Sequence, residues 1–462
     1  MSYSDFIAGK LQHALPTGLS YDPRLDAYDL LPHQHDLVRW SLRRGRCAIF
    51  ADTGLGKTRM QLAWADQVHR VTGFDVLILA PLAVAAQTVE EGKAIGVTVH
   101  PCRERDDARP GINITNYDRL HKFEPAAFGA VVLDESSCIK HSDTKTLAAL
   151  LQAFASTPFK LCATATPAPN DWTELGTHAE FLGICSRAEM LAEYFVHDGG
   201  ETQVWRLKGH AREQFWRWVA SWGAMVRRPS DLGHDDSAYL LPPLHIHEHL
   251  IETQAEATGM LFALEASTLS ERRAARKGSL ADRVAACAAM VNATEGPAIV
   301  WCDLNDESKA LVKAIDGALE ITGADDVDVK EARLDTFKHA PNQRLISKPS
   351  ICGFGLNWQH CATMAFVGVT DSYEAYYQAV RRIWRFGQTQ PCHVHIYASH
   401  LEGAVVANLK RKEAAALSMA DQLSTATRDA VRAEVTGVTR QTNSYLPRQR
   451  ITVPHWLTSE IA

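Results

Sequence analysis

The sequence lacks the features of a membrane-spanning, secreted or disulfide-stabilised protein. None of its apolar runs reaches the roughly 20 residues that span a bilayer. The opening residues MSYSDFIAGK lack the charged-then-apolar pattern of a secretion signal. The ten cysteines stand singly, with no C-x-x-C pair, so neither a zinc ribbon nor a disulfide framework is indicated. We therefore expect a protein of the reducing cytoplasm, with no membrane partner.

An excess of positive charge is also missing. The chain has 48 Lys and Arg against 54 Asp and Glu, a net charge of −6. Any contact with nucleic acid must therefore come from local basic patches or backbone amides. A hydrophobic content of 46% and a length of 462 residues indicate a folded chain with two or three domains.

Short apolar segments that end in polar residues recur along the chain and predict strands of a parallel α/β fold. They lie at residues 46–51, 75–83, 111–117, 128–135, 159–167, 297–305, 343–351, 362–369 and 392–399. The pattern lapses at about 180–240, which suggests two α/β domains. The predicted divisions are an N-terminal extension 1–27, a first domain 28–232, a linker 233–255, a second domain 256–425 and a C-terminal tail 426–462.

The segment ADTGLGKT, residues 51–58, fits the A-x-x-x-x-G-K-T form of the Walker phosphate loop. Backbone N–H groups of such a loop surround phosphate oxygens, and glycine permits the tight curl. Lys57 would meet the β- and γ-phosphates, and the hydroxyl of Thr58 would hold Mg²⁺. The alternative is a plain Gly-rich turn, but a strand before it and a helix after it favour nucleotide binding.

The segment LDESSCIK, residues 133–140, places two acids at the end of an apolar strand. Asp134 would hold Mg²⁺, and Glu135 would position and deprotonate the attacking water. Alone, this pattern fits an ordinary strand end equally well. A phosphate loop upstream favours the catalytic interpretation.

With these two motifs in view, the chain resembles the helicase-like ATPases of superfamily two, in particular their Swi/Snf type. More narrowly it is similar to the compact DEAD/DEAH-box helicases of phages and prophages. The resemblance covers roughly residues 28–400 with the motifs in the family's order. They include LPHQ at 31–34, LILAPLAVAAQ at 77–87, ITNYDRL at 114–120, TATP at 164–167 and QAVRRIWRFGQ at 378–388. The resemblance implies two tandem RecA-like domains with ATP in the cleft between them.

The resemblance also implies residue roles. Arg382 and Arg385 would be arginine fingers, which fits the need to stabilise negative charge on the transferred phosphoryl group. Thr164 and Thr166 would couple hydrolysis to domain movement. The nucleotide-contacting residues would be Gln34, Thr53, Gly54, Leu55, Gly56, Lys57, Thr58 and Gln378. Nucleic-acid contacts would come from Pro81, Asn116, Tyr117, Gly355 and Asn357.

One departure from the family pattern concerns coupling. Ser136 and Ser137 stand where the family has Ala-Asp or Ala-His, positions that contact the coupling motif and the finger motif. The metal-binding chemistry is unaffected by this change, but the coupling of hydrolysis to movement is left open.

Two other segments have alternative interpretations. The Trp-rich segment 203–228 holds Trp205, Trp216, Trp218 and Trp222, which fit either a packed helix face or stacking on bases, and packing is favoured. His245, His247 and His249 alternate with apolar residues, as in a half-buried strand. A metal site on these histidines is the disfavoured alternative.

The sequence therefore predicts a Mg²⁺- and ATP-dependent motor acting on nucleic acid, most of all on duplex DNA. Phage or host replication and recombination proteins would be further partners. The alternatives are a strand-separating DNA or RNA helicase and, less favoured, an ATP-gated clamp for a protein partner.

Overall fold

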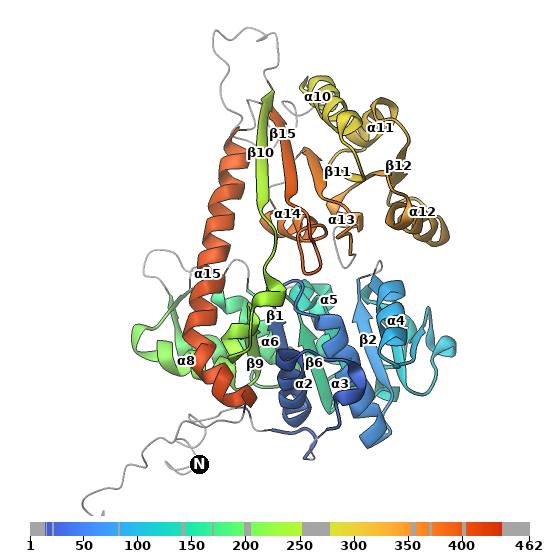
Figure 1. Cartoon of the computed structure of the whole chain (residues 1–462). Coiled ribbons are helices and arrows are strands. Elements are labelled where there is room, and N and C mark those ends of the chain that lie inside the picture. Colours follow the sequence, from blue (N-terminus) through green and yellow to red (C-terminus); the bar gives the residue numbers. More distant parts are fainter. Residues whose placement is uncertain are drawn as a thin grey trace, which may run out of the picture.

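A computed structural model describes most of the chain. It covers residues 14, 16–20, 23–81, 84–139, 144–168, 171–197, 205–251, 278–352, 357–368, 372–399 and 403–436. Two large sheets lie at the centres of two α/β domains, one above the other in Figure 1, which we call the first lobe and the second lobe.

The first lobe is built on a seven-stranded sheet in the order β3-β4-β2-β5-β6-β1-β9, and its strands pair in parallel. The strands are β1 (Arg46–Ala51), β2 (Val76–Ala80), β3 (Val99–Pro101), β4 (Ile112–Asn116), β5 (Ala130–Asp134), β6 (Phe159–Ala163) and β9 (Gly223–Val226). The central strands β2, β5 and β6 are buried along their whole length. A parallel sheet covered on both faces explains why these segments are continuous apolar runs without alternation.

Helices cover both faces of this sheet. One face packs against α2 (Pro32–Arg44), α3 (Lys57–Thr72) and α4 (Ala85–Ala94). The other face packs against α5 (Lys145–Ala153), α6 (Leu175–Leu182), α7 (Arg187–Tyr194) and α8 (Arg212–Ala220). A two-stranded antiparallel ribbon of β7 (Phe195–His197) and β8 (Trp205–Leu207) lies beside α7 and α8.

The second lobe has a six-stranded parallel sheet in the order β10-β15-β14-β11-β13-β12. Its strands are β10 (Leu244–Ile251), β11 (Ala298–Cys302), β12 (Ala318–Ile321), β13 (Arg344–Ser347), β14 (Thr363–Val367) and β15 (Cys392–Ser399). One face packs against α10 (Leu280–Ala293) and α11 (Asn305–Ala314). The other packs against α12 (Val327–His339), α13 (Pro349–Cys352) and α14 (Tyr373–Val380).

A long helix, α15 (Gly403–Thr436), leaves the second lobe and runs down one side of the first (Figure 1). Lys410 pairs with Glu248 of β10 at 2.6 Å. Further along, Arg428 pairs with Asp231 at 3.3 Å, and Val431 and Val435 enter the first lobe's core. The helix therefore joins the lobes a second time, apart from the linker.

The predicted fold class is confirmed, and each segment predicted as a strand coincides with a strand. The short strands β3, β9 and β12 were missed, because three or four residues give too little pattern to recognise. Two predicted boundaries differ from the secondary structure. Residues 244–251, placed in the linker, form the edge strand β10, and α15 continues through the boundary at 425.

No helix in the described part of the chain combines the length and apolar character that crossing a membrane requires.

Candidate active site

The phosphate loop lies between the end of β1 and the start of α3. Gly54 and Gly56 have φ angles of 93° and 82°, in the left-handed region that favours glycine. A Cβ added to Gly56 would lie 2.2 Å from Nε2 of Gln34, so glycine is also required by space there. The loop leads directly into the N-terminus of α3, a favourable place for an anion. This geometry fits bound phosphate.

Lys57 begins α3 and turns back across the loop. Its Nζ donates a hydrogen bond to the carbonyl oxygen of Ala51 at 3.0 Å. Burial lowers the pKa of Lys57, although the carboxylates of Glu135, Asp52 and Asp134 act to raise it. The lysine is thus held among the groups that would surround a triphosphate.

Asp134 ends β5 beside this loop. Gln61, one helical turn after Lys57, donates from Nε2 to Oδ1 of Asp134 at 2.6 Å. The hydroxyl of Tyr117 donates to the Asp134 carbonyl oxygen at 2.7 Å. Burial and the neighbouring Glu135 raise the pKa of Asp134 from 3.8 to about 6. The carboxylate is therefore fixed in place and is costly to ionise without a cation.

Glu135 has a φ of 50°, in the left-handed region that non-glycine residues rarely adopt. Such a conformation costs on the order of 1–3 kcal/mol and commonly occurs at functional sites. Thr164 donates to Oε2 of Glu135 at 3.5 Å, and the N–H of Thr166 donates to the Thr164 hydroxyl at 3.2 Å. Of the two predicted coupling residues, Thr164 is thus in contact with the predicted base, and Thr166 is in contact with Thr164.

Ser136 and Ser137 follow Glu135 in a 3-10 turn, and both are buried. The Ser136 hydroxyl lies 3.1 Å from Nε2 of His178, a buried residue of α6. Burial lowers the pKa of His178 to about 4, so the imidazole is neutral at pH 7. Sequence reasoning missed His178 and Gln61, because no motif marks either residue.

The finger motif of the second lobe lies against this site. Gln378 lies in α14; its main-chain carbonyl and Oε1 accept hydrogen bonds from Nε and Nη2 of Arg382 at 2.8 and 2.9 Å. Burial lowers the pKa of Arg382 to about 10 and that of Arg385 to about 9, and Glu135 opposes both changes. Arg382 is therefore buried and Arg385 partly buried, and Glu135 acts electrostatically on both.

The donor set at this site fits Mg²⁺. Carboxylate and hydroxyl oxygens are its preferred protein ligands, and it commonly takes only one or two of them beside substrate phosphates. Asp134 and Thr58 would hold it. Among the described residues there is no cluster of three or more His, Cys, Asp or Glu able to hold a metal.

Gln34 lies 4% exposed at the start of α2. Its Oε1 accepts from the N–H of Leu31 at 3.0 Å, and its Nε2 donates to the carbonyl oxygen of Leu55 at 3.0 Å. The side chain thus ties the phosphate loop to α2. Contact with the adenine base stays a prediction.

A cleft of about 1080 Å³ lies between the lobes and includes two of the predicted nucleic-acid contacts, Pro81 and Asn357. Its acidic lining residues, Glu90, Glu91, Asp118, Glu331 and Asp335, outnumber its Arg and Lys residues, Arg59, Lys330 and Lys338. The cleft is therefore not a continuous basic track.

The other predicted nucleic-acid contacts have different positions. Asn116 caps the turn after β4, and its Oδ1 accepts from the N–H of Arg119 at 3.0 Å. Tyr117 supports the Asp134 main chain, as described above. Gly355 lies outside the described residues. Binding of nucleic acid by any of these residues stays a prediction.

Three of the four tryptophans of the Trp-rich segment lie in the core, as the favoured interpretation predicts, and the fourth, Trp205, is partly buried against the ring of His197. Trp216 is 4% exposed, and its ring lies 4.9 Å from that of Trp172 in an edge-to-face contact. Trp218 and Trp222 are also buried, 5.3 Å apart between ring centres. These rings fill the space under β1 and β9 and are not available to stack on bases.

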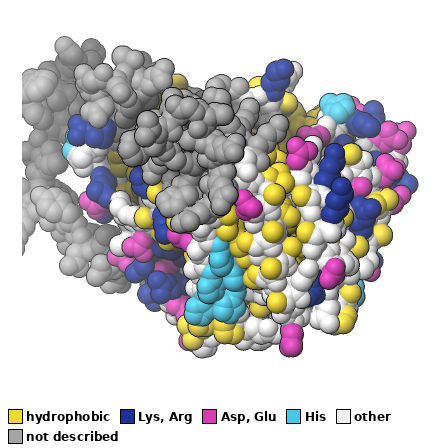
Figure 2. Space-filling view, turned by 90° about the horizontal axis from the view of Figure 1, so that it is seen from above, with side chains coloured by type: hydrophobic (Ala, Val, Ile, Leu, Met, Phe, Trp, Pro, Cys, Tyr) yellow, Lys and Arg dark blue, Asp and Glu magenta, His cyan; other side chains and the backbone are white. Residues whose placement is uncertain are grey.

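The three histidines of the 244–251 segment lie on one side of β10, and two more from β15 join them. Their rings stack in pairs, and His247 Nε2 lies 3.0 Å from Nδ1 of His393. Figure 2 shows them as one continuous histidine surface. The predicted strand is present, but the predicted burial of its apolar side is wrong: Ile246 and Leu250 are 41% and 50% exposed, whereas the histidine side packs against β15.

Comparison with known protein families agrees with the motifs of the first lobe. Residues 33–217 match the SNF2-related domain. This stretch contains the phosphate loop, both acids and the coupling threonines, and it supports a helicase-like ATPase of the Swi/Snf type. A search of curated proteins found no match for the chain.

Proposed function

We propose that this chain is an ATP-driven motor that hydrolyses ATP to ADP and phosphate while moving along duplex DNA. One observation carries the proposal: the segment of the second lobe that contains Arg382 and Arg385 lies against the phosphate loop of the first lobe, with the Tyr377 hydroxyl 2.7 Å from Asp52 and Phe386 beside Gly54. A nucleotide in this site would touch both lobes. Its binding, hydrolysis and release would therefore change how the lobes fit together.

Each group has a chemical task in this proposal. The loop N–H groups and Lys57 bind the phosphates. Glu135 orients a water molecule and accepts its proton as the oxygen attacks the γ-phosphorus and the bond to the ADP oxygen breaks. Arg382 and Arg385 stabilise the charge that spreads over the γ-phosphate oxygens. Mg²⁺, held by Asp134 and Thr58, would neutralise part of the phosphate charge when bound.

Duplex DNA as the track rests on the Swi/Snf resemblance and on the SNF2-related match over residues 33–217. Strand separation on DNA or RNA is the alternative activity. An ATP-gated clamp is disfavoured, because a protein that only binds nucleotide needs no buried fingers from a second lobe.

ATP turnover should be measured with the protein alone and with duplex DNA, single-stranded DNA and RNA at one fixed salt concentration, since phosphate contacts are strongly salt-dependent. We expect duplex DNA to stimulate turnover most. Displacement of a triplex-forming strand would indicate translocation, and opening of a forked duplex would indicate unwinding. Absence of stimulation by every nucleic acid would overturn the motor proposal.

Two variants control the assay. Glu135→Gln should keep ATP binding and lose turnover by about 10² to 10⁴, the usual contribution of a positioned base. Lys57→Ala should lose binding itself. Near-normal turnover by Glu135→Gln would show that another group activates the water.

A further inference from the structure

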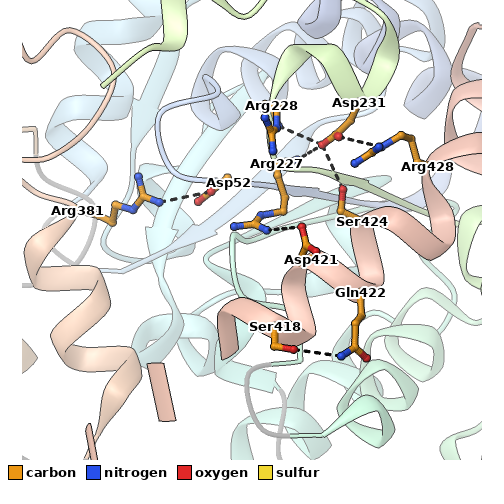
Figure 3. Close-up of polar contacts among 10 residues, drawn as sticks. All are labelled: Asp52, Arg227, Arg228, Asp231, Arg381, Ser418, Asp421, Gln422, Ser424 and Arg428. Carbon is orange, nitrogen blue, oxygen red and sulfur yellow. Dashed lines mark hydrogen bonds and ion pairs between the residues drawn. The ribbon is translucent and has the colours of Figure 1, made fainter. Parts of the chain in front are cut away.

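The phosphate loop carries an acid that no motif explains. Asp52 follows β1 directly, and Tyr377 and Arg381 of the second lobe approach it. The Tyr377 hydroxyl donates to Oδ1 of Asp52 at 2.7 Å, and Nη2 of Arg381 lies 3.5 Å from Oδ2. Figure 3 shows the guanidinium of Arg381 pointing across the lobe boundary to this carboxylate. The contact joins the phosphate loop to the end of α14.

This ion pair is preorganised and shielded, unlike an ordinary surface pair. The side chains of Arg381 and Asp52 are only 11% and 19% exposed. The guanidinium lies 5.1 Å from the ring centre of Tyr377 and 4.7 Å from that of Trp384. The Trp384 ring is itself held by a 2.7 Å hydrogen bond to the carbonyl oxygen of Pro242. The two aromatic rings therefore orient the Arg381 guanidinium toward the first lobe.

A carboxylate at this position would by itself oppose nucleotide binding. It lies in the loop that must surround several negative phosphate oxygens, which it would repel. It also attracts the ammonium group of Lys57, whose pKa it acts to raise, and so competes with the phosphates for that cation. Burial raises the pKa of Asp52, but Arg381, Tyr377 and the Thr53 N–H together hold it below its usual value. The acid is therefore ionised, and the larger part of its neutralising charge comes from Arg381 of the other lobe, with a smaller part from Lys57.

The same contact lies next to the fingers. Arg382 follows Arg381 directly, and Arg385 lies three residues further on, in the turns that follow α14. The phosphate loop also packs closely against the finger motif at Gly54. A Cβ added to Gly54 would lie 3.1 Å from both the Cβ and the main-chain N of Phe386. The finger motif therefore rests on the phosphate loop at two points, one ionic and one steric.

We propose that Asp52, Tyr377 and Arg381 form an interlobe latch that admits ATP only when the second lobe neutralises Asp52, and that fixes the fingers at the same time. These are positioning residues, and the inference rests on the proposed ATPase function. The latch has two separate effects. The charge of Asp52, when it is not neutralised, lowers the affinity for ATP, and the contact of Asp52 with Tyr377 and Arg381 positions the fingers and so raises turnover.

A double-mutant cycle tests both effects, with KM and kcat for ATP measured in the full chain. Arg381→Ala should raise KM about tenfold or more, because the carboxylate is left near the phosphates, and should lower kcat. Asp52→Asn should leave KM unchanged or lower and still reduce kcat. In the double variant KM should return to the wild-type value, whereas kcat should stay as low as in the single variants.

The matched control is Asp325 with Arg333, an ion pair at 3.1 Å wholly within the second lobe. Asp325→Asn and Arg333→Ala should change neither KM nor kcat. Melting temperatures of all variants show whether they fold. Additive effects on KM in the Asp52 and Arg381 cycle, or a KM that stays high in the double variant, would overturn the latch.

A second readout separates failure of the latch from failure of the ATPase proposal. Fluorescent labels at Lys93 in α4 and Lys309 in α11, both exposed, report the distance between the lobes without any nucleotide. Arg381→Ala should lengthen the mean distance between the labels or broaden the distribution of distances. If wild-type protein neither binds nor hydrolyses ATP, the ATPase proposal fails, and an unchanged interlobe distance in Arg381→Ala would then also refute the latch.

Discussion

Replacing Asp134 with asparagine should stabilise the ligand-free protein while abolishing ATP hydrolysis. Asp134 is 6% exposed, and burial together with Glu135 raises its pKa from 3.8 to about 6. The folded protein therefore holds the protonated carboxyl more tightly than the unfolded chain does. Ionising this group within the fold costs free energy that asparagine avoids.

The magnitude follows from the two pKa values. The shift from 3.8 to about 6 corresponds to about 3 kcal/mol, at about 1.4 kcal/mol for each pKa unit. Below pH 3.8 the carboxyl is protonated in both states and there is no cost. The cost grows as the pH rises from 3.8 to about 6, where the unfolded chain is ionised and the folded protein still holds the proton, and it is complete above about pH 7. Asp134→Asn should therefore be more stable by about 3 kcal/mol at pH 8 and by about half of that at pH 5.

Thermal unfolding between pH 5 and pH 8, without Mg²⁺ or nucleotide, measures this difference. For a lobe of this size, about 3 kcal/mol corresponds to a rise of about 6–12 °C in Tm. Asp335→Asn is the matched control, because that side chain is 73% exposed and should melt like wild type. Adding Mg²⁺ and ATP should stabilise the wild type more than Asp134→Asn. Equal Tm values at pH 8, or a gap that does not depend on pH, would refute the reasoning.

Three further outcomes are expected. Glu307→Ala should destabilise the second lobe by about 3–5 kcal/mol, because it removes the carboxylate that lies 2.9 Å from the fully buried guanidinium of Arg283. Urea titrations followed by tryptophan fluorescence would measure this loss. Trp216→Ala should destabilise the first lobe by about 3–5 kcal/mol, since the ring is 4% exposed; normal stability with weakened DNA affinity would instead favour base stacking. Arg385→Ala should lower kcat by about 10³ or more, with nucleotide affinity in a fluorescent-ATP titration within a few fold of wild type; an equal loss of affinity would contradict a finger role.

The parts of the site that lie within one lobe could be predicted from the sequence. The carboxyl ends of neighbouring parallel strands meet at one edge of a sheet, so functional residues at the ends of β1, β5 and β6 are expected together. The structure brings the phosphate loop, Asp134 and Thr164 together there. The Trp spacing at 218 and 222 likewise predicted a packed helix face, because residues four apart share one face.

Contacts that depend on how segments pack were not predictable in this way. The contact of Gln61 with Asp134 could not be predicted from the sequence, because the position of Gln61 one turn after Lys57 gains meaning only once the structure shows that it faces Asp134. His178, Tyr377 and Arg381 have none, because each reaches its partner across 42 to 329 positions of sequence. Periodicity and motif spacing describe one element at a time, whereas these pairs are set by the packing of α6 and by the apposition of the lobes.

The unusual Ser136 now has a structural explanation that bears on coupling. In the family pattern alanine stands at the position of Ser136, and the larger polar Asp or His stands at the position of Ser137. Here the hydroxyl of Ser136, which replaces that alanine, lies 3.1 Å from Nε2 of His178 in α6, a contact within the first lobe. Ser137 is also buried, and its side chain is smaller than the Asp or His that it replaces. Glu135 keeps its contact with Thr164, and the lobe boundary at the phosphate loop is spanned by the contacts of Tyr377 and Arg381 with Asp52. Communication between the lobes would then begin at the phosphate loop, where Tyr377 and Arg381 contact Asp52.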